Sequence, residues 1–478
     1  MQTHDCDVLV IGSGPGGATT ACLLAEAGRD VILLEEGAHL GLDSAPPYSI
    51  AETTQKYRNG GLTVALGRTM VTCIEGRCVG GGSEINAALC HWPMDQTLEG
   101  WSERFRIRDL SNRSLEPFRA EVERDLTVSS LRGPLDGAST ILKAGAEALG
   151  WRSEEVQRFW QYPDSGDGPG QRQSMTETLV PRALAAGCRL LPDTRVIRLV
   201  LGGGEAREAR AIHTPPGEPP EAIRVRFRHL FVCGGPIQTP LILRRSGLQD
   251  PIGQNLRMHP MIRLVACFDD PINDPTVGVP VQQVVAFKPE MTLGCSQAAL
   301  PHLVMWLGGQ GEALRERLAN WQTMALFYVL VEGTTSGSVQ NLPLLNEPLM
   351  RYPLNDTDRG RLSLALQRLI RLLFTAGARE IFHPYAGHPP LRRKLDANTL
   401  GDRIPHGKTA VSTIHLFGTC PMGEDASRCV VDSWGRMRAL GNTWINDASI
   451  LPDTTGVNPQ ATLLAVARRN VRHYLETV

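Results

Sequence analysis

Three glycines near the amino terminus stand in the spacing that binds a phosphate group. Gly12, Gly14 and Gly17 form a GxGxxG pattern that follows the apolar run Cys6–Ile11 and precedes a segment of good helix formers. In such a strand, loop and helix, the first glycine permits a tight turn and the second lets the backbone approach a pyrophosphate. The third lets the helix pack closely on the strand, and free N–H groups at the start of the helix attract the phosphates. The pattern therefore predicts a dinucleotide site.

An acidic residue follows the next apolar run. Val31–Leu34 is predicted as a second buried strand, and Glu35 comes directly after it, roughly 20 residues beyond Gly12. A carboxylate at this place accepts hydrogen bonds from the adenosine ribose hydroxyls and repels a 2′-phosphate. The unit therefore favours NAD or FAD over NADP, and by itself it does not choose between NAD and FAD. Ser13, between the first two glycines, is a further candidate for contact with the cofactor.

A second glycine-rich segment, GRCVGGGSEIN, spans residues 76–86. Its three consecutive glycines allow the backbone to pass close to a flat or bulky group. Together with the first cluster, they suggest a second contact with the same long cofactor. The candidate contacts in this segment are Arg77, Gly81, Gly82 and Asn86.

In this segment and in later ones, the chain resembles the glucose–methanol–choline (GMC) family of flavin oxidoreductases. The first family signature is matched by Gly76, Arg77, Val79, Gly80, Gly81, Gly82, Ser83, Ile85, Asn86 and Pro93, with Cys90 as a minor departure. The second signature runs from Gly235 to Leu248, with Gln249 in place of a final glycine. Further landmarks are Ile252-Gly253-Gln254-Asn255-Leu256, His259-Pro260, His415-x-x-Gly418-Thr419-Cys420, Asp447-Ala448-Ser449 and Asn458-Pro459. The resemblance is thin only in roughly residues 95–170 and 265–405, where such a family would vary with its substrate.

The resemblance implies that the cofactor is FAD. In some relatives a histidine just before the signature asparagine bonds covalently to the flavin; Ile85 stands there, so non-covalent FAD is expected. Asp447, with its neighbour Ala448, is expected to contact the ribityl chain or the pyrophosphate. We expect Val196 to contact adenine through its backbone. The helix predicted near the carboxyl end would direct its positive amino-terminal end at the flavin, with the backbone N–H of Gln460 as the donor.

The resemblance also implies a reaction, the oxidation of an alcohol CH–OH group to an aldehyde or ketone. Hydride removal from an alcohol carbon needs a base for the hydroxyl proton, and histidine is the natural candidate near neutral pH. His415 occupies the position of the family's catalytic histidine, and Asn458 occupies the position of its partner. We therefore expect His415 to act as general base, Asn458 to hold the hydroxyl and flavin N5 to accept the hydride.

Other interpretations stay open. A lyase on the same scaffold would keep FAD as a structural group and use His415 for acid–base chemistry without hydride transfer. An NAD-linked dehydrogenase would use only the amino-terminal unit. A non-catalytic flavin-binding protein is favoured least, because His415 and Asn458 both stand where chemistry would need them. The version EGRCVGGGSEIN of the first signature resembles bacterial branches that act on sugar-like or aminocyclitol alcohols, and the electron acceptor would be oxygen or a redox carrier.

These residues predict an α/β fold, in which a Rossmann-like FAD-binding domain carries an inserted α+β substrate domain with an antiparallel sheet plus helices. The cofactor domain is expected in three pieces, residues 1–95, 175–262 and 410–478, the last with the catalytic residues. Residues 96–174 would form connecting helices that cover the substrate, and residues 263–409 would form the substrate domain. Strands are predicted at Leu190–Leu201, His229–Cys233, Met261–Phe268, Val281–Phe287, Met324–Val331 and Thr443–Asn446, and helices at Leu115–Leu126, Asp356–Ala376 and after Asn458.

Composition narrows the class of protein. The 478 residues include 49 Lys and Arg against 50 Asp and Glu, a formal charge of −1, which excludes a generic electrostatic nucleic-acid binder. No apolar run approaches the roughly 18 residues that span a bilayer, and no signal peptide is visible. The 11 cysteines form no CxxC pair and are interpreted as thiols of a reducing compartment, not as disulfides or metal ligands. A cytoplasmic enzyme is expected.

Overall fold

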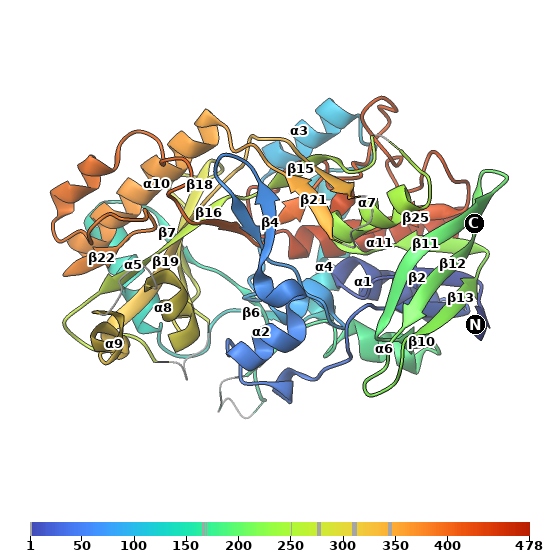
Figure 1. Ribbon diagram of the computed structural model, residues 1–478, viewed down its shortest axis with the longest axis horizontal. Coiled ribbons are helices and arrows are strands. Elements are labelled where there is room, and N and C mark those ends of the chain that lie inside the picture. The colour runs from blue at the N-terminus through green and yellow to red at the C-terminus, as the bar shows by residue number, and fades with distance from the viewer. Residues whose placement is uncertain are drawn as a thin grey trace.

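The computed structural model describes residues 2–164, 168, 170–249, 251–274, 279–307, 313–342 and 347–478. A parallel sheet runs in the order β10 (Arg189–Leu191), β3 (Val31–Leu34), β2 (Val8–Ile11), β14 (His229–Val232) and β25 (Thr443–Ile445). Every residue of β2 and β3 is buried, because both faces of this sheet are covered, as continuous apolar strands predict. Figure 1 shows β2 and β25 close to the two chain termini.

Alternate residues of the central strand serve two different cores. Val8 and Val10 join the cluster formed with the helices α1 (Pro15–Glu26), α6 (Leu179–Ala185) and α11 (Gln460–Thr477). Leu9 and Ile11 join the opposite cluster. That cluster includes residues from a second sheet of order β1 (Gln2–Asp5), β13 (Glu221–Arg226), β12 (Glu205–His213) and β11 (Thr194–Gly202). The parallel sheet is therefore the middle layer of a Rossmann-like unit.

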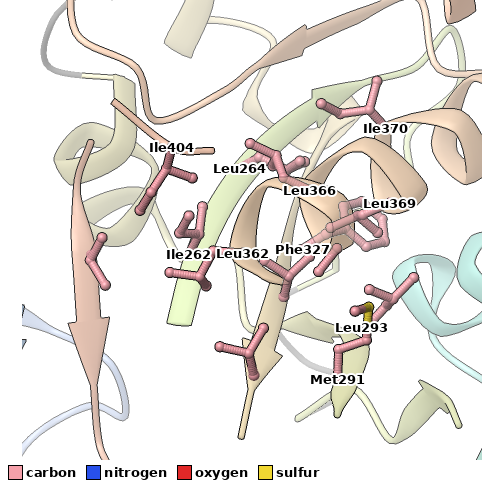
Figure 2. Close-up of a cluster of buried hydrophobic side chains, with 14 of the residues drawn as sticks. Ile262, Leu264, Met291, Leu293, Phe327, Leu362, Leu366, Leu369, Ile370 and Ile404 are labelled. Atoms are coloured by element: carbon pink, nitrogen blue, oxygen red, sulfur yellow. The ribbon is translucent and has the colours of Figure 1, made fainter. Parts of the chain in front are cut away.

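A larger, mainly antiparallel sheet carries the rest of the fold. Its order is β24 (Leu416–Phe417), β15 (Gln254–Met258), β20 (Gly337–Asn341), β21 (Pro348–Arg351), β4 (Thr63–Leu66), β5 (Val71–Cys73), β23 (Val411–Thr413), β16 (Met261–Cys267), β19 (Met324–Val331), β18 (Met291–Ser296), β17 (Gln282–Val284) and β7 (Ser153–Glu155), with β22 (Glu380–Phe382) also paired to β16. The long helix α10 (Asp356–Thr375) packs with α5 (Gly137–Ala148) on one face of this sheet. Figure 2 shows Leu362 and Leu366 of α10 beside Ile262 and Leu264 of β16.

The remaining helices border these layers. They are α2 (Ile50–Lys56), α3 (Asp95–Phe105), α4 (Asn112–Asp125), α7 (Gly235–Arg245), α8 (Leu300–Leu307) and α9 (Ala313–Leu318). A small sheet pairs β6 (Val128–Ser129), β8 (Arg158–Gln161) and β9 (Gln171–Arg172). Within the described residues, no helix is long and apolar enough to cross a membrane.

The predicted fold class, a Rossmann-like unit combined with an antiparallel sheet and helices, is confirmed. One predicted strand differs from the structure, because the run Leu190–Leu201 divides into β10 and β11, which belong to different sheets. The break falls at Pro192 and Asp193. Proline has no N–H for a strand ladder, and Asp193 has a left-handed φ of 52°, so the chain turns there from one sheet to the other.

Candidate active site

The first glycine loop is built from close backbone contacts. Gly12 has a φ of +98°, and a Cβ there would lie 2.3 Å from the carbonyl oxygen of Cys233. A Cβ at Gly17 would lie 1.8 Å from the carbonyl oxygen of Gly12, so the turn between β2 and α1 closes against the residues after β14 only because both positions are glycine. At Gly14, by contrast, an added Cβ would meet no atom within 4 Å. Gly12 and Gly17 are therefore required by packing within the loop, while Gly14 faces open space.

The two glycine clusters lie against each other. A Cβ at Gly81 would lie 2.9 Å from the Cα of Gly14. Ser13 links the two segments, because its Oγ accepts a hydrogen bond from the Gly80 N–H at 3.1 Å and donates to Glu35 Oε2 at 2.7 Å. Glu35 also accepts the Ser13 backbone N–H at 3.0 Å. The Glu35 carboxylate, which is predicted to bind ribose, therefore also holds the first glycine loop in place.

A cavity of about 1520 Å³, including its open mouth, runs along these loops. The predicted site residues that line it are Gly12, Gly14, Glu35, Gly81, Gly82, Asn86, Val196, His415, Asp447, Ala448, Asn458 and Gln460. Ser13, Gly17 and Arg77 are not among its lining residues. The cavity thus joins segments from the whole length of the chain.

His415 lies in the connection between β23 and β24, and its imidazole is buried on the cavity wall. Its backbone N–H donates to Thr413 Oγ1 at 3.2 Å, and the Thr413 hydroxyl donates to the His415 carbonyl at 3.0 Å. The Nδ1 atoms of His415 and His259 lie 3.1 Å apart and share a hydrogen bond. Burial, together with the positive charge of Arg263, lowers the pKa of His415 to about 3. The imidazole is therefore neutral at physiological pH, and Nε2 is the ring nitrogen left for a ligand.

Asn458 and the start of α11 lie on the same cavity as His415. The Asn458 side chain is half-buried and has no hydrogen-bond partner within the described part of the chain. The next residues open α11, and Gln460 Oε1 accepts a hydrogen bond from Asn86 Nδ2 at 2.5 Å. Asn86 Oδ1 accepts the Ala88 N–H at 2.8 Å. The second glycine cluster and the carboxyl-terminal helix are thus connected directly at the cavity wall.

Comparison with known proteins assigns the chain to a family. Two models described as GMC oxidoreductase match residues 54–261 and 340–467. The chain belongs to the GMC oxidoreductase family. A third model, described as an NAD(P)-binding Rossmann-like domain, matches residues 10–64, which include the first glycine loop.

Several GMC-type relatives match along almost the full chain. The protein is 36% identical over 472 residues to an uncharacterized GMC-type oxidoreductase, y4nJ, of Sinorhizobium fredii, covering 97% of this chain and 94% of that protein. It is 26% identical to the 6'''-hydroxyparomomycin C oxidase of Streptomyces lividus, covering 98% and 90% of the two chains. It is 24% identical to the long-chain-alcohol oxidase FAO3 of Arabidopsis thaliana, covering 97% and 67%.

Among solved structures, pyridoxine 4-oxidase from Mesorbium loti superposes with a TM-score of 0.75 at 22% identity, covering 99% of this chain and 100% of that one. At this level of identity the similarity shows a shared fold. The GMC fold therefore accommodates both the matched signatures and the regions where the sequence resemblance is thin.

Asp447 of this GMC oxidoreductase ties the end of β25 to a neighbouring helix. Its Oδ2 accepts the Gly235 N–H at 2.9 Å and the Thr239 hydroxyl at 2.5 Å, both from α7. Its Oδ1 accepts the Ser449 N–H at 2.7 Å. Burial raises the pKa of Asp447 even though these donors favour the carboxylate. The residue predicted to contact the cofactor thus also fixes the position of α7.

Sequence reasoning missed a charged group at the Glu35 end of the cavity. Glu36 forms ion pairs with Arg58 at 2.9 Å, Arg77 at 3.3 Å and Arg195 at 3.8 Å. Burial opposes the ionisation of Glu36, but Arg58 and the other two arginines outweigh it and lower the pKa of Glu36. Arg77, predicted to bind the cofactor, therefore lies half-exposed beside Glu36. The only signal in the sequence was Glu36, the second of the two glutamates that directly follow β3.

Proposed function

We propose that this GMC oxidoreductase binds FAD non-covalently and oxidises the CH–OH group of a small polar alcohol, with His415 as the general base. The observation that carries the proposal is a buried, neutral imidazole on the wall of the cavity that both glycine loops line, with Nδ1 held by His259 at 3.1 Å. A neutral imidazole fixed at one nitrogen is suited to accept a proton at the other.

The residues present fit FAD. Gly14 and Gly82 both line the cavity, and a side chain at either would project into space that contains no protein atom within 4 Å. The amino-terminal end of α1 adds free N–H groups beside Gly14, which suits a pyrophosphate. Glu35 and Val196 also line the cavity, and we assign Glu35 to the ribose and Val196 to the adenine. Ile85 precedes Asn86, so the position that forms a covalent bond to the flavin in some relatives has no nucleophile.

When bound, FAD would supply the acceptor for the hydride of the alcohol carbon. The protein's own part is to bind and orient the alcohol and to remove its hydroxyl proton. His415 Nε2 accepts that proton, and the bond from Nδ1 to His259 holds the ring in place. The Asn458 carboxamide, which has no protein partner in the described chain, hydrogen-bonds the substrate hydroxyl. Most of the rate enhancement then comes from fixed positions of the reacting groups.

The substrate expected from the signature is a sugar-like or aminocyclitol alcohol. The 6'''-hydroxyparomomycin C oxidase among the relatives supports a polar alcohol, and the long-chain-alcohol oxidase supports CH–OH oxidation more generally. Oxygen or a redox carrier would take up the electrons in a second half-reaction.

Anaerobic reduction of the holoenzyme tests this function. Mixing with alcohols in the absence of oxygen should abolish the visible absorption of oxidised flavin, and His415→Ala should slow this loss by orders of magnitude while keeping FAD bound. His388→Ala, a change at an exposed histidine outside the cavity, is the matched control and should react like the parent protein. Turnover of an alcohol without any reduction of the flavin would instead support the lyase, and a colourless protein that uses NAD would support the dehydrogenase.

A further inference from the structure

The strand β16 carries one charged side chain, Arg263, in an otherwise apolar sequence. Along β16, Ile262 and Leu264 face the core under α10, as Figure 2 shows. Arg263 therefore points to the opposite face, because side chains alternate along a strand. On that face Met261 packs in a cluster with Ile414, and Ile414 lines the cavity beside His415. The face that carries Arg263 thus reaches the wall of the candidate active site at Ile414, although Arg263 itself is not among the residues that line the cavity.

Polar groups continue from Arg263 across the neighbouring strands. Tyr328 of β19 is paired with Arg263 in register, and its hydroxyl accepts a hydrogen bond from Gln283 Nε2 at 2.7 Å. Gln283 Oε1 in turn bonds His91 Nε2 at 3.0 Å. A Cβ at Gly294 would lie 2.3 Å from the Tyr328 ring, so this glycine of β18 makes room for the tyrosine. These polar side chains therefore form a strip that runs from Arg263 through Tyr328 and Gln283 to His91.

Arg263 brings a positive charge with no opposite charge to match it. Its Nη1 donates to Ser412 Oγ at 2.9 Å, and the guanidinium lies 5.8 Å from the Trp306 ring centre. Within the described residues it forms no ion pair. The titratable groups with an electrostatic effect on its pKa are the phenols of Tyr328 and Tyr57, which are neutral. Burial lowers the pKa of Arg263 to about 10, so it stays protonated at neutral pH. Arg263 is half-buried, and a cation withdrawn from water without a counter-charge is costly unless a ligand supplies one.

Other charged groups near this strip have their own partners. Lys288, which acts on His91, pairs with Glu154 at 3.3 Å. Glu52 of α2 accepts the Tyr48 N–H at 2.6 Å. The carboxylate of Glu52 contributes to the raised pKa of Tyr48 and of Tyr57, but it does not contribute to the pKa of Arg263. The unmatched charge on this face is therefore positive.

We propose that the alcohol substrate carries a carboxylate, which pairs with Arg263 while the CH–OH group reaches His415. This rests on the proposed function and assigns its substrate to acidic alcohols, such as hydroxy acids or acidic sugars, in place of the aminocyclitol alternative. Arginine offers two parallel donors to a carboxylate, and the unoccupied hydroxyl proton of Tyr328 adds a third. An ammonium-bearing aminocyclitol would be repelled by Arg263, and a long alkyl alcohol would leave the whole polar strip without partners.

Three benzyl alcohols that differ only in the para substituent test the proposal. In 4-(hydroxymethyl)benzoate, benzyl alcohol and 4-(hydroxymethyl)benzylamine, the group remote from the CH–OH is anionic, absent or cationic. We expect kcat/KM to be highest for the benzoate and lowest for the benzylamine. Arg263→Met should lower kcat/KM for the benzoate roughly 10- to 100-fold more than it lowers kcat/KM for benzyl alcohol, so that the preference for the anionic substrate is lost. Arg371→Met, at an exposed position of α10, is the matched control and should keep the parent preference.

Binding of unreactive ligands separates this inference from the proposed function. Benzoate and benzamide are titrated into the oxidised holoenzyme, and the change in the flavin spectrum is recorded. Tighter binding of benzoate that is lost in Arg263→Met supports the inference even if none of the three alcohols is oxidised. Equal binding of benzoate and benzamide, no binding of either, or a charge preference that survives in Arg263→Met would overturn it.

Discussion

Replacing Gly14 by Ala separates the demands of the cofactor from the demands of the fold. Gly14 has φ −62° and ψ −177°, an extended conformation open to any residue, and an added Cβ meets no atom within 4 Å. The apoprotein should therefore keep its stability or gain about 0.4–1 kcal/mol, because alanine restricts the unfolded chain. The new methyl group lies on the cavity wall, where the pyrophosphate would have to approach the backbone.

The size of the effect follows from the contacts that the methyl group blocks. Loss of one charge-assisted hydrogen bond between a backbone N–H and a phosphate costs about 1.5–3 kcal/mol, which is roughly a 10- to 150-fold rise in the Kd for FAD. Gly17→Ala should behave in the opposite way, because its Cβ would lie 1.8 Å from the Gly12 carbonyl oxygen. That change should destabilise the apoprotein itself.

Two measurements read out this pair of variants. Thermal unfolding of the apoproteins reports on the fold, and titration with FAD, followed by flavin fluorescence, reports on binding. A Gly14→Ala protein that binds FAD as tightly as the parent would refute the placement of the pyrophosphate at this loop. A Gly17→Ala apoprotein as stable as the parent would refute the packing argument.

Three further predictions concern the catalytic pair and the charged end of the cavity. His259→Phe removes the partner of His415 Nδ1 and should lower kcat roughly 100-fold with FAD retained. In His259→Asn the amide oxygen can accept the same hydrogen bond, so this variant should keep a higher kcat than His259→Phe. Equal kcat values in both variants would contradict the positioning role. Burial lowers the pKa of His415 to about 3, and a general base works only when it is unprotonated. We therefore expect kcat/KM to stay constant, as far as His415 determines it, between about pH 8 and about pH 5. A fall in kcat/KM centred near the ordinary histidine pKa of about 6.5 would count against a buried, neutral His415 as the base. Glu36→Gln leaves Arg58 and Arg195 without their shared carboxylate, so denaturant unfolding should show a loss of about 1–3 kcal/mol, and an unchanged unfolding midpoint would speak against the ion-pair group.

Much of the cofactor unit could be predicted from the sequence, because its rules are local. The apolar runs at Val8–Ile11 and Val31–Leu34, the glycine spacing and the acid after the second run all lie within the first 36 residues. Residues matched through the GMC resemblance, such as His415 and Asn458, were found far apart in the chain and line one cavity. Their catalytic roles stay predictions.

The features that sequence reasoning missed depend on contacts between distant segments. The bond between His259 and His415 joins residues 156 positions apart, and no local pattern at either histidine indicates it. Arg263 stands in an otherwise apolar strand, so its position predicts a strand but not which face carries the charge. The run Leu190–Leu201 is apolar on both sides of Pro192, so the apolar pattern alone predicts one strand, whereas the proline and the left-handed Asp193 divide it into two.

The hydrogen bond between Asn446 Nδ2 and Thr20 Oγ1, 2.9 Å long, connects residues 426 positions apart. It fastens the end of β25 to α1, and α11 packs on the same helix. During synthesis, α1 can pack early on β2, β3 and α6, but its last partner, α11, exists only when almost the whole polypeptide has been made. Contacts so distant in sequence form slowly, and the nascent chain is exposed to aggregation during this interval. Flavin loading should accordingly be an event of the finished polypeptide, and an amino-terminal fragment made alone should be prone to aggregate.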